Sequence, residues 1–211
     1  MITLDNILAF LGAYLIGSIP SAVWIGKYFY DIDVREYGSG NSGATNTFRV
    51  LGKKAGIPVL LLDMFKGWAA VYLAHLTGIF PSGSDQFYNL QMAMAIAALL
   101  GHLFPVFAGF RGGKGVATML GIIIALHPLA ALICLGIFFI VFILTHYVSL
   151  SSMITGLSFP FIIMLLFHNS IVAINIFAMF VSILILVTHQ KNIERLLRGE
   201  ESKINIMKLR K

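Results

Sequence analysis

The chain has 211 residues, of which 58% are hydrophobic and only 11% are charged, and its formal net charge is +6. A soluble domain carries about 25% charged residues, so this composition excludes an ordinary soluble domain and indicates an integral membrane protein. The single cysteine, Cys134, excludes a disulfide framework within one chain.

Apolar runs predict an all-α integral membrane protein with about seven transmembrane helices. The runs lie near residues 4–26, 55–77, 88–108, 115–127, 128–146, 150–168 and 170–188. Most reach the ~20 residues that a helix needs to cross ~30 Å of hydrocarbon. The short run, 115–127, would cover only about 20 Å, so we expect it to start deep in the membrane from a re-entrant loop. We expect a single polytopic membrane domain over 1–211.

The basic residues predict the orientation of these spans. With seven spans, every extramembrane Lys and Arg falls on one side, in or beside the segments 28–54, 109–115 and 189–211. The positive-inside rule then places the N-terminus outside and the C-terminus in the cytoplasm. If 115–146 were one kinked span, the basic segments 28–54 and 189–211 would lie on different sides of the membrane. Cations facing anionic lipid account for the charge, so no nucleic-acid partner is predicted.

The stretch GFRGGKGVAT, 109–118, combines glycines with two cations. It fails the nucleotide-binding pattern G-x-x-x-x-G-K-[ST], because the first glycine and the hydroxyl residue are absent. The backbone N–H groups of Gly112, Gly113 and Gly115 can still approach an anion, Lys114 adds a full charge, and a helix begins just afterwards. The stretch therefore predicts a site for one phosphate. The alternative is a flexible interfacial turn whose cations contact lipid phosphate.

A second polar stretch, YGSGNSGATNTFRVLGKKAG, covers residues 37–56. Arg49 can bind a phosphate bidentately. Several neighbours can hydrogen-bond an anion or a polyol: Ser39, Asn41, Thr45 and Asn46. The alternative is an ordinary capped loop, with Lys53 and Lys54 anchoring the next helix.

Ionisable residues also lie within or next to the spans. Asp63 and Lys66, three residues apart on one helix, are expected to pair, either structurally or to orient the neighbouring polar loop. His102 precedes the glycine-rich stretch and is expected to support it. No metal site is predicted, because there is no second cysteine and no pair of histidines at metal-binding spacing.

Two polar clusters lie near the C-terminal spans. Ser149 and Ser151 belong to THYVSLSS, where no acid is near in sequence, so we expect hydrogen bonding rather than nucleophilic catalysis. His189 and Asn192 are three residues apart, so on a helix that continues from the last span they would share one face.

These stretches together resemble the PlsY family, the bacterial acyl-phosphate:glycerol-3-phosphate acyltransferases. The resemblance runs over nearly the full length and in family order. The matching stretches are YLIGSIPSAVWIGK (14–27), GSGNSGATNTFRVLGKKAG (38–56), LLDMFKG (61–67), GHLFPVFAGFRGGKGVAT (101–118), SLSS (149–152) and HQKNIERLLRGEE (189–201).

The resemblance implies an enzyme of the bacterial inner membrane with its active site at the cytoplasmic face. It would transfer a fatty acyl group from acyl phosphate to the sn-1 hydroxyl of glycerol 3-phosphate, giving lysophosphatidic acid and phosphate. Its partners would be these two substrates, membrane lipid and the soluble enzyme that makes acyl phosphate. No cofactor is implied, and two rival functions remain, a transporter or channel for organic phosphates and a lipid-binding scaffold.

The resemblance also implies roles for single residues. His189 and Asn192 would form the catalytic pair and hold the glycerol end, while the base would be either His189 or a phosphate oxygen of the donor, which we favour. The resemblance implies that Ser39, Arg49, Lys114 and the backbone of 112–115 hold phosphate, with the serines of 149–152 in support. Together with the residues singled out above, the predicted substrate-binding set is Ser39, Asn41, Thr45, Asn46, Arg49, Lys66, His102, Gly112, Gly113, Lys114, Gly115, Thr118, Ser149 and Ser151.

Overall fold

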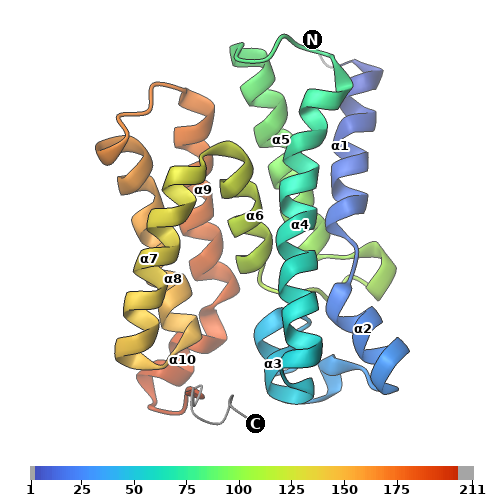
Figure 1. Cartoon of the computed structure of the whole chain (residues 1–211), viewed down its shortest axis with the longest axis vertical. Helices are drawn as coiled ribbons and strands as arrows, with labels where there is room; N and C mark the ends of the chain where they lie inside the picture. The colour runs from blue at the N-terminus through green and yellow to red at the C-terminus, as the bar shows by residue number, and fades with distance from the viewer. Residues whose placement is uncertain (1–2, 204–211) are drawn as a thin grey trace. The chain divides into compact units, whose positions relative to one another are not determined.

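The computed structural model describes residues 3–203, and all regular elements in this range are helices (Figure 1). The prediction of an all-α protein is therefore confirmed. The chain forms two compact units, Met1–Leu126 and His127–Lys211, which are described separately below. The prediction of a single domain over 1–211 stays a prediction, and its C-terminal part, 204–211, lies outside the described residues.

The first unit contains α1 and α2, a short 3-10 helix η1, α3 to α5, a second 3-10 helix η2, and α6. In it α4 packs against α6, α1 and α5, and α3 packs against the start of α4. A Cβ at Gly121 of α6 would overlap the carbonyl of Met64 in α4, so the glycine allows close backbone approach. The bounds are α1 (Leu4–Gly17), α2 (Ser21–Tyr30), η1 (Val34–Glu36), α3 (Ala44–Leu51), α4 (Lys53–Thr77), α5 (Asp85–Leu103), η2 (Val106–Ala108) and α6 (Val116–Leu126).

The first apolar run, expected over 4–26, is broken rather than continuous. Helices α1 and α2 meet at an angle of 41° across residues 18–20. Pro20 lacks a backbone N–H and precedes α2 directly, which accounts for an interruption here. The carbonyl of Ile19, freed by the break, accepts a hydrogen bond from Lys66 Nζ at 2.8 Å.

The second unit is a bundle in which α8 packs against both α7 and α9. Ser182 of α9 donates a hydrogen bond to the carbonyl of Gly156 in α8 at 2.7 Å, which ties these two helices together. Its elements are α7 (Pro128–Thr145), α8 (Val148–Phe161), a π-helical turn η3 (Ile162–Leu166), α9 (Val172–Thr188) and α10 (Gln190–Leu197).

The expectation that the last span continues as one helix through His189 is wrong. Helices α9 and α10 meet at an angle of 59°, and His189 lies at the bend with φ −106° and ψ 10°. The His189 side chain bonds through Nδ1 to the carbonyl of Ile185 at 2.8 Å. The ring therefore binds the last turn of α9, and the chain leaves in a new direction.

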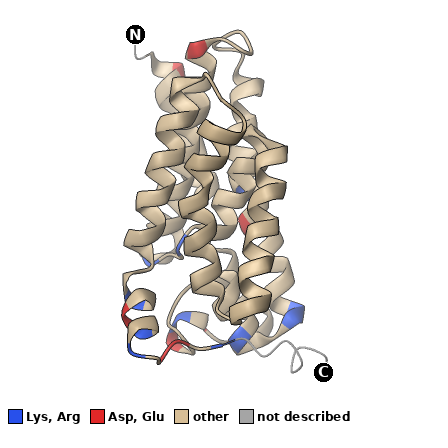
Figure 2. Cartoon of the chain, turned by 90° about the vertical axis from the view of Figure 1, so that its left-hand side faces the viewer, with Lys and Arg blue, Asp and Glu red and all other residues tan. Residues whose placement is uncertain are grey.

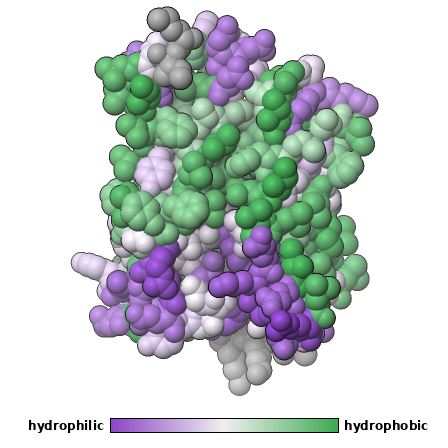
Figure 3. All heavy atoms as spheres, turned by 180° about the vertical axis from the view of Figure 1, so that it is seen from behind, coloured by the Kyte–Doolittle hydropathy of each residue, from purple (hydrophilic) through white to green (hydrophobic). Residues whose placement is uncertain are grey.

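The long helices carry apolar surface suited to a bilayer. Figure 3 shows a broad apolar area over the helices on one face of the molecule, and Figure 2 shows charged residues mainly at helix ends and in connecting segments. Among residues 3–203, four helical segments are long and apolar enough to span: α4, α5 together with η2, α7, and α8 together with η3. The number rises to as many as 6 if each bent helix pair counts as one span. Helix α6 has only 11 residues, in keeping with the short run predicted at 115–127. The protein is thus a multi-pass membrane protein, while the count of seven spans and the orientation stay predictions.

Candidate active site

The glycine loop, residues 109–115, connects η2 to α6 in the first unit. Its Gly112 N–H donates to the carbonyl of Leu103 at 3.1 Å, and its Gly113 N–H donates to that of His102 at 3.2 Å. The expectation that these two N–H groups face an anion is therefore wrong, because both are used to hold the loop on the end of α5. The donors that helix geometry still offers are the N–H groups of the first turn of α6, next to Lys114.

A buried polar network lies beneath this loop. Lys66 Nζ and Asp63 Oδ1 are 2.9 Å apart, which confirms the predicted pair. Thr118 Oγ1 lies 3.2 Å from His102 Nδ1, and the same nitrogen lies 3.8 Å from Asp63 Oδ1. A Cβ at Gly113 would overlap the imidazole of His102, so only glycine lets the loop lie this close. The four buried side chains thus form a support for the glycine loop, and any direct contact of theirs with substrate stays a prediction.

The polar loop, residues 37–46, is organised around one buried side chain, that of Asn46. Its Nδ2 donates to the carbonyls of Val34, Tyr37 and Asn41 at 2.8, 3.1 and 3.0 Å. Its Oδ1 accepts from the backbone N–H of Ser39 at 2.9 Å. The amide is fully engaged with the loop's own chain, so Asn46 shapes the loop, and its predicted contact with substrate stays untested.

The other predicted residues of this segment lie nearer to solvent. Ser39 and Arg49 are exposed, while Asn41 and Thr45 are half-buried. Thr45 and Arg49 are four residues apart on α3 and so share one face of that helix. A hydroxyl and a guanidinium on one accessible face suit the predicted binding of a phosphate.

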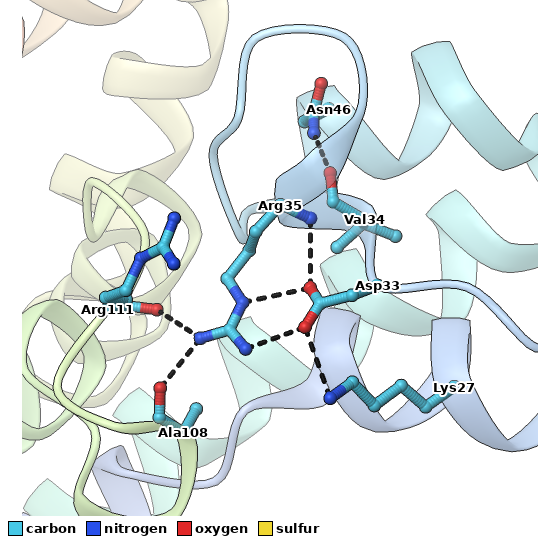
Figure 4. Close-up of polar contacts among 7 residues, drawn as sticks. All are labelled: Lys27, Asp33, Val34, Arg35, Asn46, Ala108 and Arg111. Atoms are coloured by element: carbon cyan, nitrogen blue, oxygen red, sulfur yellow. Dashed lines mark hydrogen bonds and ion pairs between the residues drawn. The ribbon is translucent and has the colours of Figure 1, made fainter.

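One residue that the sequence analysis did not single out, Arg35 of η1, connects the two loops. Its Nη1 donates to the carbonyl of Ala108 at 2.7 Å, at the start of the glycine loop (Figure 4). Its guanidinium also binds Asp33, and the hydrogen bonds from Arg35 lower the pKa of Asp33 well below the usual range, although partial burial opposes this. The structure therefore brings the two predicted phosphate-binding segments together within the first unit.

In the second unit, the predicted Ser149 and Asn192 converge on a carboxylate that the sequence analysis missed. Glu201 Oε1 accepts from Ser149 Oγ at 2.5 Å and from Asn192 Nδ2 at 2.7 Å, while Oε2 accepts from Arg195 Nε at 2.7 Å. Burial alone would raise the pKa of Glu201, but the hydrogen bonds from these three side chains outweigh it and lower the pKa. Glu201 is therefore an ionised anchor for α8 and α10.

The remaining predicted residues of this unit are engaged locally. Ser151 Oγ donates at 2.8 Å to the carbonyl of Tyr147, the residue directly before α8. His189 Nδ1 lies 2.8 Å from the carbonyl of Ile185, which can only accept. In a neutral imidazole this contact places the proton on Nδ1 and makes Nε2 the acceptor nitrogen.

Comparisons with known proteins place this arrangement in a family. The family model described as glycerol-3-phosphate acyltransferase matches residues 7–199. A glycerol-3-phosphate acyltransferase of Listeria monocytogenes is 46% identical over 205 residues, covering 97% of this chain and 100% of the relative. That of Staphylococcus carnosus is 43% identical over 202 residues, covering 95% and 98%.

The fold is also that of a solved membrane enzyme. The crystal structure of PlsY, an integral membrane glycerol 3-phosphate acyltransferase, in its glycerol 3-phosphate form is similar with a TM-score of 0.86 and 35% identity, covering 97% of this chain and 98% of the other. Its lysophosphatidic acid form is similar with a TM-score of 0.83. Matches of this length and identity show that the chain belongs to the glycerol-3-phosphate acyltransferase (PlsY) family.

Proposed function

We propose that this protein transfers a fatty acyl group from acyl phosphate to the sn-1 hydroxyl of glycerol 3-phosphate, giving lysophosphatidic acid and inorganic phosphate. The observation that carries the proposal is the similarity to PlsY in forms with glycerol 3-phosphate and with lysophosphatidic acid, a substrate and a product of this reaction. The juxtaposed polar and glycine loops of the first unit supply the cations that phosphate-bearing substrates require.

The phosphate-binding groups in this proposal are Arg49, Lys114 and Ser39, together with the N–H groups of the first turn of α6. Arg49 offers a planar fork of donors, and Lys114 offers a compact charge beside a positive helix end. Gly112 and Gly113 contribute by holding the loop on α5 rather than by donating to the substrate. His102 and Lys66 act beneath the loop as its support.

The glycerol hydroxyls are assigned to His189 and Asn192 of the second unit. His189 presents Nε2 as an acceptor because Nδ1 faces a backbone carbonyl. Asn192 is oriented by Glu201, which accepts only and so selects the NH₂ end of the amide. The contact with Glu201 therefore fixes the direction of the Asn192 side chain, although α10 lies close to the end of the described chain.

The chemistry needs no protein nucleophile. An acyl phosphate is a mixed anhydride, so the glycerol oxygen attacks the carbonyl carbon, the bond from that carbon to the phosphate oxygen breaks, and phosphate leaves with the electron pair. The hydroxyl proton goes to a phosphate oxygen. Alignment of the reactants and stabilisation of the developing oxyanion are then the protein's main contributions.

A serine mechanism is disfavoured by the environment of Ser149. Its hydroxyl does donate to Glu201, but the lowered pKa of that carboxylate makes it a weak base. Ser151 and Ser152 each donate to a backbone carbonyl four residues earlier, at the start of α8. The serines therefore act as hydrogen-bonding supports in the proposed reaction.

We further propose seven spans, an outer N-terminus and a cytoplasmic active site in the bacterial inner membrane, with the soluble enzyme that makes acyl phosphate as a partner. The positive-inside distribution of Lys and Arg supports this arrangement. It puts both phosphate-binding loops on the side where the water-soluble substrate is available.

The proposal is tested with purified protein, acyl phosphate and radiolabelled glycerol 3-phosphate. Labelled lysophosphatidic acid with equimolar phosphate release supports it, and acyl-CoA or acylated acyl carrier protein as sole donor should give no product. Uptake of labelled glycerol 3-phosphate into proteoliposomes without product would instead support an organic-phosphate transporter. Lipid binding with neither activity would support a scaffold.

A further inference from the structure

The side chain of Arg35 joins the two loops to which phosphate binding is assigned (Figure 4). Its Nη1 donates to the carbonyl of Ala108 at 2.7 Å and approaches that of Arg111 at 3.4 Å, so it contacts both ends of the turn that opens the glycine loop. Along the chain Arg35 comes shortly before Ser39. It is thus the direct link between the backbone of one loop and the entrance of the other.

Asp33 fixes the guanidinium in this bridging position. Nε donates to Asp33 Oδ1 at 2.9 Å and Nη2 donates to Oδ2 at 2.7 Å, a bidentate arrangement. The Arg35 and Asp33 side chains are only 13% and 10% exposed. All three nitrogens of the guanidinium therefore already have acceptors within the protein, which distinguishes Arg35 from the exposed Arg49 and argues against a role as a phosphate ligand.

The turn that Arg35 holds is one that needs an external tie. Gly109 and Phe110 both have left-handed backbone conformations, with φ of 64° and 58°. Such a conformation is uncommon for a bulky residue like phenylalanine. The Phe110 N–H is bonded to the carbonyl of Pro105, at 2.9 Å, which closes the turn from the α5 side. Arg35 closes it from the side of the polar loop.

We propose that Arg35 is a positioning residue that holds the glycine loop in register with the polar loop, so that Lys114 and Arg49 act on the same phosphate. This inference rests on the proposed function. Lysine cannot replace Arg35 in this role, because an ammonium group cannot bind a carboxylate bidentately and also donate in the same plane to the carbonyl of Ala108.

The test compares Arg35→Lys, Arg35→Ala and the control Lys27→Ala in purified protein. Lys27 contacts the same carboxylate, with its Nζ 3.3 Å from Asp33 Oδ2, but its side chain is 58% exposed. We expect Arg35→Lys to raise KM for glycerol 3-phosphate by about tenfold with kcat within about threefold of wild type, because a phosphate contact is made in both ground and transition states. Amide hydrogen exchange over residues 105–115 should accelerate by about tenfold, while Lys27→Ala changes neither quantity.

Three results would overturn the inference. One is a wild-type KM in Arg35→Lys, the second is a raised KM with unchanged exchange over 105–115, and the third is a parallel loss of kcat and thermal stability without a KM effect. If Arg35→Ala does not fold, the KM and the hydrogen exchange of Arg35→Lys decide whether the inference holds. The exchange measurement does not require turnover. An inactive wild-type protein would therefore refute the proposed function, while hydrogen exchange in Arg35→Lys would still show whether Arg35 holds the glycine loop.

Discussion

The carboxylate of Glu201 accepts a hydrogen bond from the side-chain amide of Asn192 at 2.7 Å, and this contact orients a residue predicted to bind glycerol. A carboxylate can only accept, so it holds the NH₂ end of Asn192 and turns the carbonyl end the other way. The direction of the Asn192 amide is thereby fixed.

Glu201→Gln should therefore impair the enzyme although it preserves shape. The introduced NH₂ group would face donors of Arg195 or Asn192, which breaks one of the present hydrogen bonds. We expect kcat/KM for glycerol 3-phosphate to fall by about tenfold or more, equivalent to ~1.4 kcal/mol. Glu200→Gln is the matched control, since it removes the same charge from the adjacent, exposed position; an equal loss in both variants would contradict the assigned role.

Lys114→Ala and Arg49→Ala should each reduce kcat/KM for glycerol 3-phosphate by at least about tenfold, ~1.4 kcal/mol, because each removes a full charge from the proposed phosphate site. Steady-state kinetics with acyl phosphate in excess gives the comparison. Lys54→Ala, at an exposed position early in α4, controls for the loss of a cation near the membrane surface. Near-normal kinetics in both site variants would refute the phosphate assignment.

His189→Ala should affect glycerol 3-phosphate more than acyl phosphate. In the proposed reaction His189 binds a glycerol hydroxyl, and only glycerol 3-phosphate carries free hydroxyls. Measuring KM for each substrate with the other held near saturation separates the two effects. A similar rise in both KM values would count against the placement of His189 at the glycerol end.

The Asp33–Arg35 pair makes stability depend on pH. The pKa of Asp33 is lowered in the folded protein, so its contribution is fully present above the ordinary aspartate pKa of about 3.9 and is lost as the pH falls through the lower folded value. Asp33→Asn should lower the unfolding temperature in detergent at pH 6. The difference from wild type should shrink as the pH falls below about 3.9; a constant difference down to pH 2 would show that ionisation of Asp33 is irrelevant.

The predicted topology can be checked by cysteine accessibility. In a Cys134→Ala background, Ser82→Cys and Ser202→Cys place thiols at exposed positions, one between α4 and α5 and one beyond α10. With seven spans, a membrane-impermeant maleimide should label position 82 in intact cells and position 202 only after permeabilisation. Labelling of both from one side would show that the region of α6 does not cross, because an even number of spans would then separate them.

The sequence predicted the helical architecture well because long apolar runs leave few alternatives. A backbone in hydrocarbon must satisfy its own hydrogen bonds, so a run such as 55–77 can hardly be anything other than a helix like α4. The pairing of Asp63 with Lys66 was predictable for a related reason, since both lie on that one helix at a spacing that brings side chains together.

The contacts that the sequence did not reveal join residues distant along the chain. Ser149 and Glu201 are separated by 52 positions, so no local pattern indicates that they share a hydrogen bond. Arg35 and Ala108 are separated by 73 positions, and the acceptor is a backbone carbonyl, which has no signature in the sequence. The bend at His189 was missed for a different reason. The residues around it remain compatible with a continuous helix, and the ring's bond to the carbonyl of Ile185, four residues earlier, has no distinct sequence pattern.

The short length of α6, 11 residues, has a consequence for the stability of acyl phosphate toward hydrolysis. At 1.5 Å per residue the helix covers about 17 Å, little more than half of a ~30 Å hydrocarbon layer. If its far end reaches one boundary of that layer, the loop at its start is sunk below the headgroups of the other leaflet. Bulk water is scarce at that depth, so spontaneous hydrolysis of the acyl phosphate would be suppressed while its acyl chain remains among the lipid chains.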